Sequence, residues 1–189
     1  LLLLSRVYLY QKKYDDVITV VDDLLKTTET EIIPYSTLEK FISSDDVVYK
    51  VYNTNNPGMI FSWGKLDVDA TGFGYDLMRH SKAFFCASSE LIGLYDEGND
   101  LRFSRYYDKY DFNNYDEGIF YVATKNYCKA STANEAYDQA LRLEEAYLNR
   151  AEAYIEKGEH ELGMDDVNAI RAERIKGEYE LVANSVDEA

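Results

Sequence analysis

The stretch from Phe103 to Tyr127 combines aromatic rings with hydrogen-bonding side chains, since nine of its 25 residues are aromatic and Asp, Asn and Arg alternate with them. A flat ring stacks on the C–H face of a sugar, while carboxylate, amide and guanidinium groups bond the hydroxyls at its rim. The combination is therefore compatible with non-covalent binding of a ligand such as a sugar. The predicted ligand-binding residues are Arg105, Tyr106, Tyr107, Tyr110, Asn113 and Tyr115 in this stretch, with Trp63 and Tyr75 before it.

Tyrosine-rich stretches also have a purely structural use. A tyrosine buries its ring while its hydroxyl stays in water, so these side chains can pack an irregular layer onto helices. For Asp100 and Arg102, an ion pair or a helix cap is favoured over ligand contact. The acidic residues near Asp67 and between Asp108 and Glu117 lack the ligand order of a calcium-binding loop, so solvated surface is favoured over a calcium site.

Motifs for covalent chemistry are missing from the sequence. It has no nucleophile elbow, no phosphate-binding glycine loop and no cluster of metal ligands, and we therefore predict no enzymatic activity, cofactor or metal. A net charge of −15 opposes binding to nucleic acid, because the phosphate backbone is itself anionic. Cys86 and Cys128 can pair, although a buried free thiol is favoured for isolated cysteines.

The elements that would position these residues are clearest near the C-terminus, where Leu141 to Arg174 predicts two helices joined at Gly158. A capping box formed by Thr132 and Glu135 predicts that the first helix begins early and continues to Lys157. Glycine at the junction suits the left-handed position that follows a helix.

The two helices are expected to pack through apolar faces. The second helix turns Met164, Val167 and Ile170 inward and ends at Gly177, and small alanines on the first helix allow close approach. The inward stripe of the first helix is predicted to be Ala136, Ala140, Leu143, Tyr147, Ala151 and Tyr154. The residues expected outside that stripe, on a solvated or packing-adjacent face, are Glu144, Glu145, Asn149, Arg150, Glu152 and Glu156.

The N-terminal residues repeat this pattern. Laying Tyr8 on Tyr154, an offset of 146, places Lys12 on Gly158 without a gap. The matched positions are those of a tetratricopeptide unit, and because such units recur at about 34 residues, a large insertion must separate these two. We predict a mainly α fold of tetratricopeptide-like helical hairpins with a loop-rich insertion containing short strands. Its parts are a hairpin at 1–28, an aromatic-rich insertion at 29–131 and a second hairpin with its following segment at 132–189.

Within the insertion, β-branched and aromatic runs predict extended segments, and capping residues predict short helices. The strands are expected at Asp46 to Thr54 and at Met59 to Gly64. The helices are expected from the Ser36/Glu39 capping box through Phe41, and from Ser88 or Ser89 to about Tyr95, where Gly98 and Asn99 follow. Residues 104–131 show no clean periodicity.

Four segments together resemble a known family. They are SRVYLYQKKYDDVI, NPGMIFSW, SSELIGLYDEGNDLRF, and LRLEEAYLNRAEAYIEKG with NAIRAER. In order and spacing they are similar to the SusD/RagB family, the nutrient-binding lipoproteins of the Gram-negative outer membrane. The family's most specific motif is close to R-L-A-E-A-Y-L-N-R-A-E-A, where Glu144 here occupies a small-residue position. At Gly58 the family more often has Glu.

The resemblance implies a non-catalytic receptor. Such a receptor holds an oligosaccharide or polysaccharide at the mouth of a SusC-like TonB-dependent transporter, on the outer surface of the outer membrane, and is attached through a lipid anchor. This chain would be the central part of a longer protein. The competing interpretation is a tetratricopeptide-like protein-interaction scaffold without glycan binding, in which the tyrosines are structural. A glycoside hydrolase, which needs two carboxylates in a cleft, is least favoured.

Overall fold

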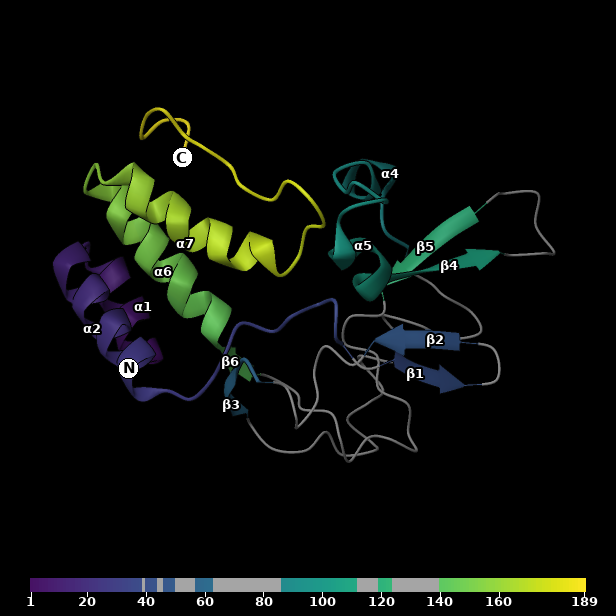
Figure 1. Ribbon diagram of the computed structural model, residues 1–189, viewed down its shortest axis with the longest axis horizontal. Coiled ribbons are helices and arrows are strands. Elements are labelled where there is room, and N and C mark those ends of the chain that lie inside the picture. The colour runs from purple at the N-terminus through teal and green to yellow at the C-terminus, as the bar shows by residue number, and fades with distance from the viewer. Residues whose placement is uncertain (39, 44–45, 50–56, 63–85, 112–118, 124–139) are drawn as a thin grey trace. The chain divides into compact units, whose positions relative to one another are not determined.

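The computed structural model describes residues 1–38, 40–43, 46–49, 57–62, 86–111, 119–123 and 140–189. The fold is mainly α with loop regions and small two-stranded sheets, as predicted (Figure 1). The chain forms two compact units, which we describe separately. The helical unit comprises Leu1–Ile33, Pro57–Phe61 and Leu141–Ala189, and the insertion unit comprises Pro34–Asn56 and Ser62–Ala140.

Two helical hairpins lie side by side in the helical unit (Figure 1). The first consists of α1 (Leu2–Tyr10) and α2 (Tyr14–Thr27), and the second of α6 (Leu143–Glu156) and α7 (His160–Ala172). Their shared core lies where α2 and α6 meet. Its buried members are Leu2, Val17, Val21, Leu24, Leu141, Ala146 and Ala153.

The turn between α6 and α7 follows the prediction for Gly158. This glycine has a φ of +86°, a left-handed backbone that strains any residue with a Cβ atom. Its amide donates to the Ile155 carbonyl at 2.9 Å, and the amide of Glu159 donates to that of Tyr154 at 2.8 Å. These two bonds form a Schellman motif, which satisfies the last carbonyls of the helix.

The turn between α1 and α2 has the same geometry at the aligned residue. Lys12 has a φ of 56°, the only positive φ at a non-glycine residue among the described positions. Its amide donates to the Leu9 carbonyl, and that of Lys13 donates to the Tyr8 carbonyl, both at 2.9 Å. The alignment that places Lys12 on Gly158 therefore also matches the hydrogen bonds of both turns.

Because Lys12 holds a conformation that costs L-residues roughly 1–2 kcal/mol, we expect Lys12→Gly to raise the free energy of unfolding. The gain should be only about 0.5–1 kcal/mol, since glycine also adds freedom to the unfolded chain. The matched change Gly158→Ala should lower the same quantity by about 1 kcal/mol. Urea denaturation followed by circular dichroism measures both, and equal signs for the two variants would contradict the expectation.

The start of α6 corrects one prediction. Residues 140–142 are the strand β6 (Ala140–Arg142), which pairs with β3 (Met59–Ser62), so no helix runs through them. Helix α6 begins at Leu143, whose amide donates to the Gly58 carbonyl at 2.9 Å. The Thr132/Glu135 capping box lies outside the described residues. Pairing with a distant strand has overridden local helix propensity here.

Helices α6 and α7 approach closely, as the small residues predicted. Ala151 is buried, and a Cβ atom added to Gly163 would lie 2.8 Å from the Ala151 carbonyl oxygen and 2.6 Å from Ile155 Cγ1. Helix α7 ends at Ala172, earlier than the predicted stop at Gly177. That glycine has a φ of +80° in the segment that follows the helix.

The inward face of α6 was predicted incorrectly in part. Leu143 and Ala151 are buried as expected, but Glu144 and Asn149, which were placed outside the apolar stripe, are also buried, at 5% and 8% exposure. Tyr147 and Tyr154 are half-buried, and the predicted stripe residue Ala136 lies outside the described part of the chain. The helix therefore turns polar as well as apolar side chains into its unit.

In the insertion unit, β1 (Lys40–Ser43) pairs antiparallel with β2 (Asp46–Tyr49). The helix predicted through Phe41 is therefore wrong, because those residues extend to form the hairpin. The strand predicted from Asp46 is confirmed to Tyr49, and that predicted from Met59 is confirmed to Ser62; the rest of both lies outside the described residues.

Two short helices and a second hairpin complete the described part of this unit. Helix α4 (Ser89–Ile92) begins as predicted, with Ser88 Oγ accepting from the Leu91 amide at 3.2 Å, but it ends three residues before Tyr95. Helix α5 (Leu101–Tyr106) leads into β4 (Tyr107–Asp111), which pairs antiparallel with β5 (Ile119–Ala123). Neither α5 nor this hairpin was predicted from the sequence.

Candidate functional site

Only some of the predicted ligand-binding residues lie in the described part of the chain. Trp63, Tyr75, Asn113 and Tyr115 lie outside it, and for Tyr110 only the backbone, within β4, is described. The three that remain lie where α5 passes into β4, and all three side chains are half-buried: Arg105, Tyr106 and Tyr107.

Tyr106 and Arg105 both contact Tyr35, which is itself fully buried. The hydroxyls of Tyr106 and Tyr35 are 2.5 Å apart, and their rings meet nearly edge to face at 76°. Arg105 Nε donates to the Tyr35 carbonyl at 3.2 Å. These contacts fasten α5 to the segment before β1, so both side chains have a structural use.

Tyr107 belongs to a second group of rings, which we call the aromatic cluster: Tyr95, Phe103, Tyr107 and Tyr121. The Tyr95 and Tyr107 ring centroids are 5.6 Å apart at 68°, and those of Phe103 and Tyr121 are 5.2 Å apart at 62°. Such tilted and edge-to-face contacts are typical of rings that pack on one another. The described rings therefore do not form a coplanar stacking surface.

Burial, together with Tyr95, raises the pKa of the Tyr107 phenol to about 12. We expect the Tyr107 phenol to ionise at a higher pH than an ordinary tyrosine, whose pKa is about 10. Because the folded state then holds a proton that the unfolded state has lost, the contribution of Tyr107 to stability falls as pH rises from 10 to 12. Absorbance at 295 nm should show a late ionisation step that is missing from Tyr107→Phe. Superimposable titrations of the two proteins would contradict this.

Asp100 and Arg102 form the cap and ion pair that the sequence favoured. Asp100 precedes α5, and its Oδ1 accepts from the Arg102 amide at 2.9 Å, while Arg102 Nη2 lies 2.6 Å from Asp100 Oδ2. The Arg102 guanidinium also lies over the Tyr95 ring, 5.5 Å from its centroid.

The prediction for the two cysteines is tested only in part. Cys86 is a free but exposed thiol, so the expectation of burial was wrong for it. Cys128 lies outside the described residues.

The helical unit contains a buried ion pair that sequence analysis missed. Arg174 Nη2 lies 2.6 Å from Glu144 Oε1, and Arg174 Nη1 donates to the Ile33 carbonyl. The other carboxylate oxygen, Glu144 Oε2, is buried without a hydrogen bond among the described residues. It lies 3.4 Å from where a Cβ atom at Gly58 would be. Sequence alone did not reveal the pair because its partners are 30 residues apart.

A surface pocket of about 340 Å³ lies between α1 and α6. None of the residues that line this pocket was predicted from the sequence to contact a ligand. Its lining residues are Arg6, Leu9, Tyr10, Glu145, Asn149 and Glu152. The available signal was the spacing of Arg6 and Tyr10, which lie one helical turn apart on α1. One face of α1 and one face of α6 therefore form the pocket.

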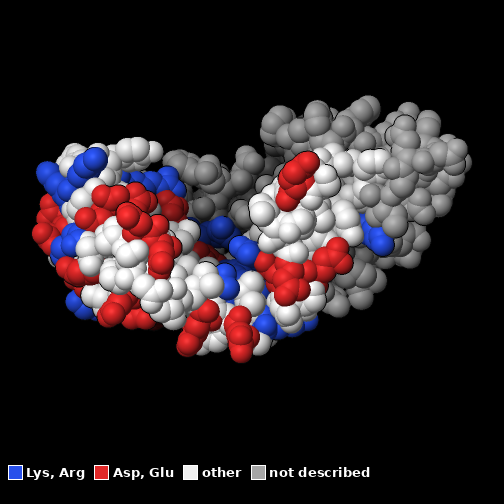
Figure 2. Space-filling model, turned by 90° about the horizontal axis from the view of Figure 1, so that it is seen from above, with Lys and Arg blue, Asp and Glu red and all other residues white. Residues whose placement is uncertain are grey.

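Comparison with known proteins gives no assignment, because no family model matches the chain and no curated protein matches it. Among the described helices, none has the length and apolar character needed to cross a membrane. Figure 2 shows Asp and Glu side chains over much of the visible face of the helical unit, at the left, with Lys and Arg between them. That distribution agrees with the net charge of −15.

Proposed function

We propose that this chain belongs to a non-catalytic, SusD/RagB-like receptor, which binds oligosaccharide or polysaccharide nutrients at the outer surface of the outer membrane. The receptor delivers them to a SusC-like TonB-dependent transporter and is attached to the membrane through a lipid anchor. The tetratricopeptide-like hairpins form the scaffold. The insertion supplies the aromatic residues that stack on sugar rings.

The observation that carries the proposal is the matched pair of turns. Lys12 and Gly158 have the same left-handed backbone and the same two closing hydrogen bonds, 146 residues apart. Two such hairpins packed side by side, with a long strand-containing insertion between them in sequence, are the organisation that the resemblance implies.

The two departures from the family pattern lie beside each other in the fold. Gly58 replaces a usual Glu and Glu144 replaces a usual small residue, and the Glu144 carboxylate lies beside Gly58. Arg174 therefore keeps a carboxylate partner, supplied from α6 and not from residue 58. Because a buried guanidinium requires such a partner, the two departures compensate each other.

The binding residues proposed for testing are Trp63, Tyr75 and Tyr115, because Tyr106 and Tyr107 already pack against neighbouring rings. Affinity electrophoresis of the intact protein through gels containing single polysaccharides is the direct test. We expect one polysaccharide to retard the protein, and Trp63→Ala or Tyr115→Ala to abolish the retardation. Tyr10→Ala is the control, since that ring is exposed on the other unit. Unretarded migration of the folded protein in every polysaccharide would contradict the proposal.

The alternative function is a tetratricopeptide-like protein-interaction scaffold. One observation favours it: the described rings of the aromatic cluster pack edge to face and are half-buried, as structural tyrosines would be. Under this alternative, the ligand lies on the helical unit and no aromatic substitution in the insertion affects it. The electrophoresis above separates the two functions.

A further inference from the structure

The pocket between α1 and α6 is lined by a buried amide that has an acceptor to spare. Asn149 is only 8% exposed and lines the pocket from α6. Ser5 donates its only hydroxyl proton to the Leu2 carbonyl at 2.7 Å, so it must accept from Asn149 Nδ2, 2.9 Å away. This assigns the amide orientation and leaves Asn149 Oδ1 as an acceptor without a hydrogen bond among the described residues. Because buried polar atoms normally have a partner, the free acceptor indicates a ligand that donates a hydrogen bond.

The charges in the lining indicate that this donor is a cation. Arg6 Nη2 lies 2.6 Å from Glu145 Oε2, and Arg6 Nε also donates to Glu145, so these two groups neutralise each other. Glu152 lies one turn after Asn149 on α6, is exposed and forms no hydrogen bond or ion pair with the described residues. The lining therefore has one carboxylate without a counter-ion, on the same helix face as the free amide oxygen.

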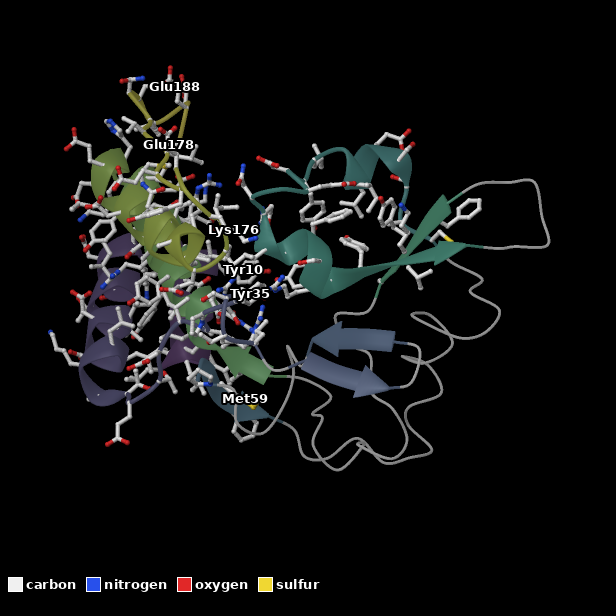
Figure 3. All side chains as sticks on the ribbon, turned by 45° about the vertical axis from the view of Figure 1, so that its right-hand side comes forward. Tyr10, Tyr35, Met59, Lys176, Glu178 and Glu188 are labelled. Atoms are coloured by element: carbon white, nitrogen blue, oxygen red, sulfur yellow. The ribbon has the colours of Figure 1, made fainter. Side chains whose placement is uncertain are left out.

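An aromatic ring and an apolar side chain lie at the same pocket. Tyr10, at the C-terminal end of α1 and labelled in Figure 3, is 92% exposed and lines the pocket. A cation held against the face of a tyrosine ring is attracted by its π electrons. Leu9 also lines the pocket and is half-buried, so it offers a surface on which a short carbon chain can pack.

The donors that the lining requires select one kind of cation. A calcium ion needs about six to eight oxygen ligands, more than one free carboxylate and one amide oxygen supply. A quaternary ammonium has no N–H group and would leave Asn149 Oδ1 without a partner. A primary ammonium has three N–H donors and can satisfy the amide oxygen and the carboxylate together.

A second pocket shows why negative charge alone does not define such a site. It has a volume of about 470 Å³ and lies between α7 and the segment that follows it. Its carboxylates are all exposed, so water solvates them: Glu161, Asp165 and Glu180. The amide at this pocket, Asn168, already bonds through both of its polar atoms to the backbone of Leu181, each at 2.9 Å. The α1/α6 pocket differs because its amide oxygen is free.

We propose that the pocket between α1 and α6 binds the primary ammonium group of a small organic amine. The ammonium donates to Asn149 Oδ1 and to the Glu152 carboxylate and lies against the Tyr10 ring, while the carbon chain packs on Leu9. The volume of about 340 Å³ is near the lower end of the range for ligand pockets, which suits a small molecule. This binding requires no glycan, and it is independent of the aromatic residues in the insertion.

The probe is n-butylammonium chloride, titrated into the ¹⁵N-labelled intact protein. Two control compounds separate charge from hydrogen bonding: n-butanol has the same chain without the charge, and tetramethylammonium has the charge without an N–H donor. We expect saturating amide shifts at α1 and α6 only, with a millimolar Kd. Binding should be weaker by about tenfold for n-butanol and by about three- to tenfold for tetramethylammonium. Affinity for n-butylammonium should fall as salt is raised.

Two variants test the named contacts. We expect Glu152→Gln to weaken n-butylammonium binding by about three- to tenfold and Tyr10→Ala by about two- to fivefold. The matched control Glu161→Gln removes an exposed carboxylate from the other pocket and should leave binding unchanged.

Four results would overturn the proposal: equal affinity for n-butanol, equal affinity for tetramethylammonium, full affinity in Glu152→Gln, or saturating shifts at α7 in place of α1 and α6. Equal affinity for tetramethylammonium would mean that the acidic surface attracts any cation without using the Asn149 acceptor. Polysaccharide retardation, measured separately, decides the proposed function without affecting this result.

Discussion

Replacing Arg174 with methionine is expected to lower the free energy of unfolding by about 3–5 kcal/mol, because the change leaves a buried carboxylate without its ion-pair partner. Only 5% of the Arg174 side chain and 7% of the Glu144 side chain are exposed. Removing the guanidinium also deprives the Ile33 carbonyl of a donor. Urea denaturation monitored by circular dichroism gives the difference directly.

The double change Glu144→Leu with Arg174→Met serves as the control, since an apolar pair of similar size has no unpaired buried charge. We expect the double variant to be more stable than Arg174→Met alone by at least about 2 kcal/mol. If the two variants were equally unstable, the loss would come from packing around Arg174 and not from the stranded carboxylate.

The same pair allows a test of the compensation between Gly58 and Glu144. In the natural background, Gly58→Glu places a second carboxylate beside Glu144, while in a Glu144→Ala background the new carboxylate replaces the one removed. The Cβ atom at residue 58 meets Ile33 Cγ1 at 2.8 Å in both backgrounds, so this strain cancels in the cycle. We expect Gly58→Glu to cost about 1–3 kcal/mol less in the second background. Additive effects would mean that the residues at positions 58 and 144 do not compensate each other.

The sequence was sufficient for features that depend on local backbone chemistry. Gly158 could be placed at a helix end because glycine adopts a left-handed backbone without strain. The same geometry at Lys12 could be predicted only through the internal alignment, because lysine itself carries no such preference. Ser88 likewise caps α4 through its side-chain oxygen, as its residue type predicts, and Asp100 caps α5, although that helix itself was not predicted.

The features that the sequence did not reveal depend on contacts between distant residues. Helix α6 begins at Leu143 because its amide bonds to Gly58, far away in the chain, and no local pattern reports that bond. Glu144 was placed outside because a glutamate is seldom buried without a partner, and the partner Arg174 becomes visible only in the fold.

The predicted sugar-binding residues show the same limit. Local composition marks the insertion as rich in tyrosine, yet composition does not distinguish a ring that stacks on a ligand from one that stacks on another ring. Tyr106 forms a hydrogen bond with Tyr35, and Tyr107 packs on Tyr95. In both cases the neighbouring ring in the fold gives the tyrosine a structural role. Glu152 and Asn149 were not proposed because α1 and α6, which are far apart in the sequence, come together only in the folded helical unit.

Replacing Arg150 with methionine is expected to destabilise the helical unit to a similar extent, by about 3–5 kcal/mol at neutral pH. Arg150 joins three helices: its Nη2 and Nε lie 2.7 and 2.8 Å from the two carboxylate oxygens of Asp166 on α7, and its Nη1 lies 2.5 Å from Asp22 Oδ1 on α2. Asp166 is buried, with only 7% of its side chain exposed, so the substitution strands its charge.

The pH dependence distinguishes this stranded charge from a simple loss of packing. Burial already raises the pKa of Asp166, against the lowering effect of Arg150, and removing Arg150 should raise that pKa further. A carboxyl with a raised pKa in the folded state destabilises it as pH rises above the unfolded value of about 4. The difference in stability between Arg150→Met and the natural protein should therefore narrow as pH falls from 7 towards 5.

Asp22 provides the matched control. Because 37% of its side chain is exposed, water can solvate the Asp22 carboxylate when Arg150 is absent. Asp22→Asn should cost less than about 1 kcal/mol, with little change between pH 7 and pH 5. Equal losses for Asp22→Asn and Arg150→Met would mean that the α2 contact dominates. A difference for Arg150→Met that stayed constant with pH would mean that its side-chain packing, and not the charge on Asp166, accounts for the loss.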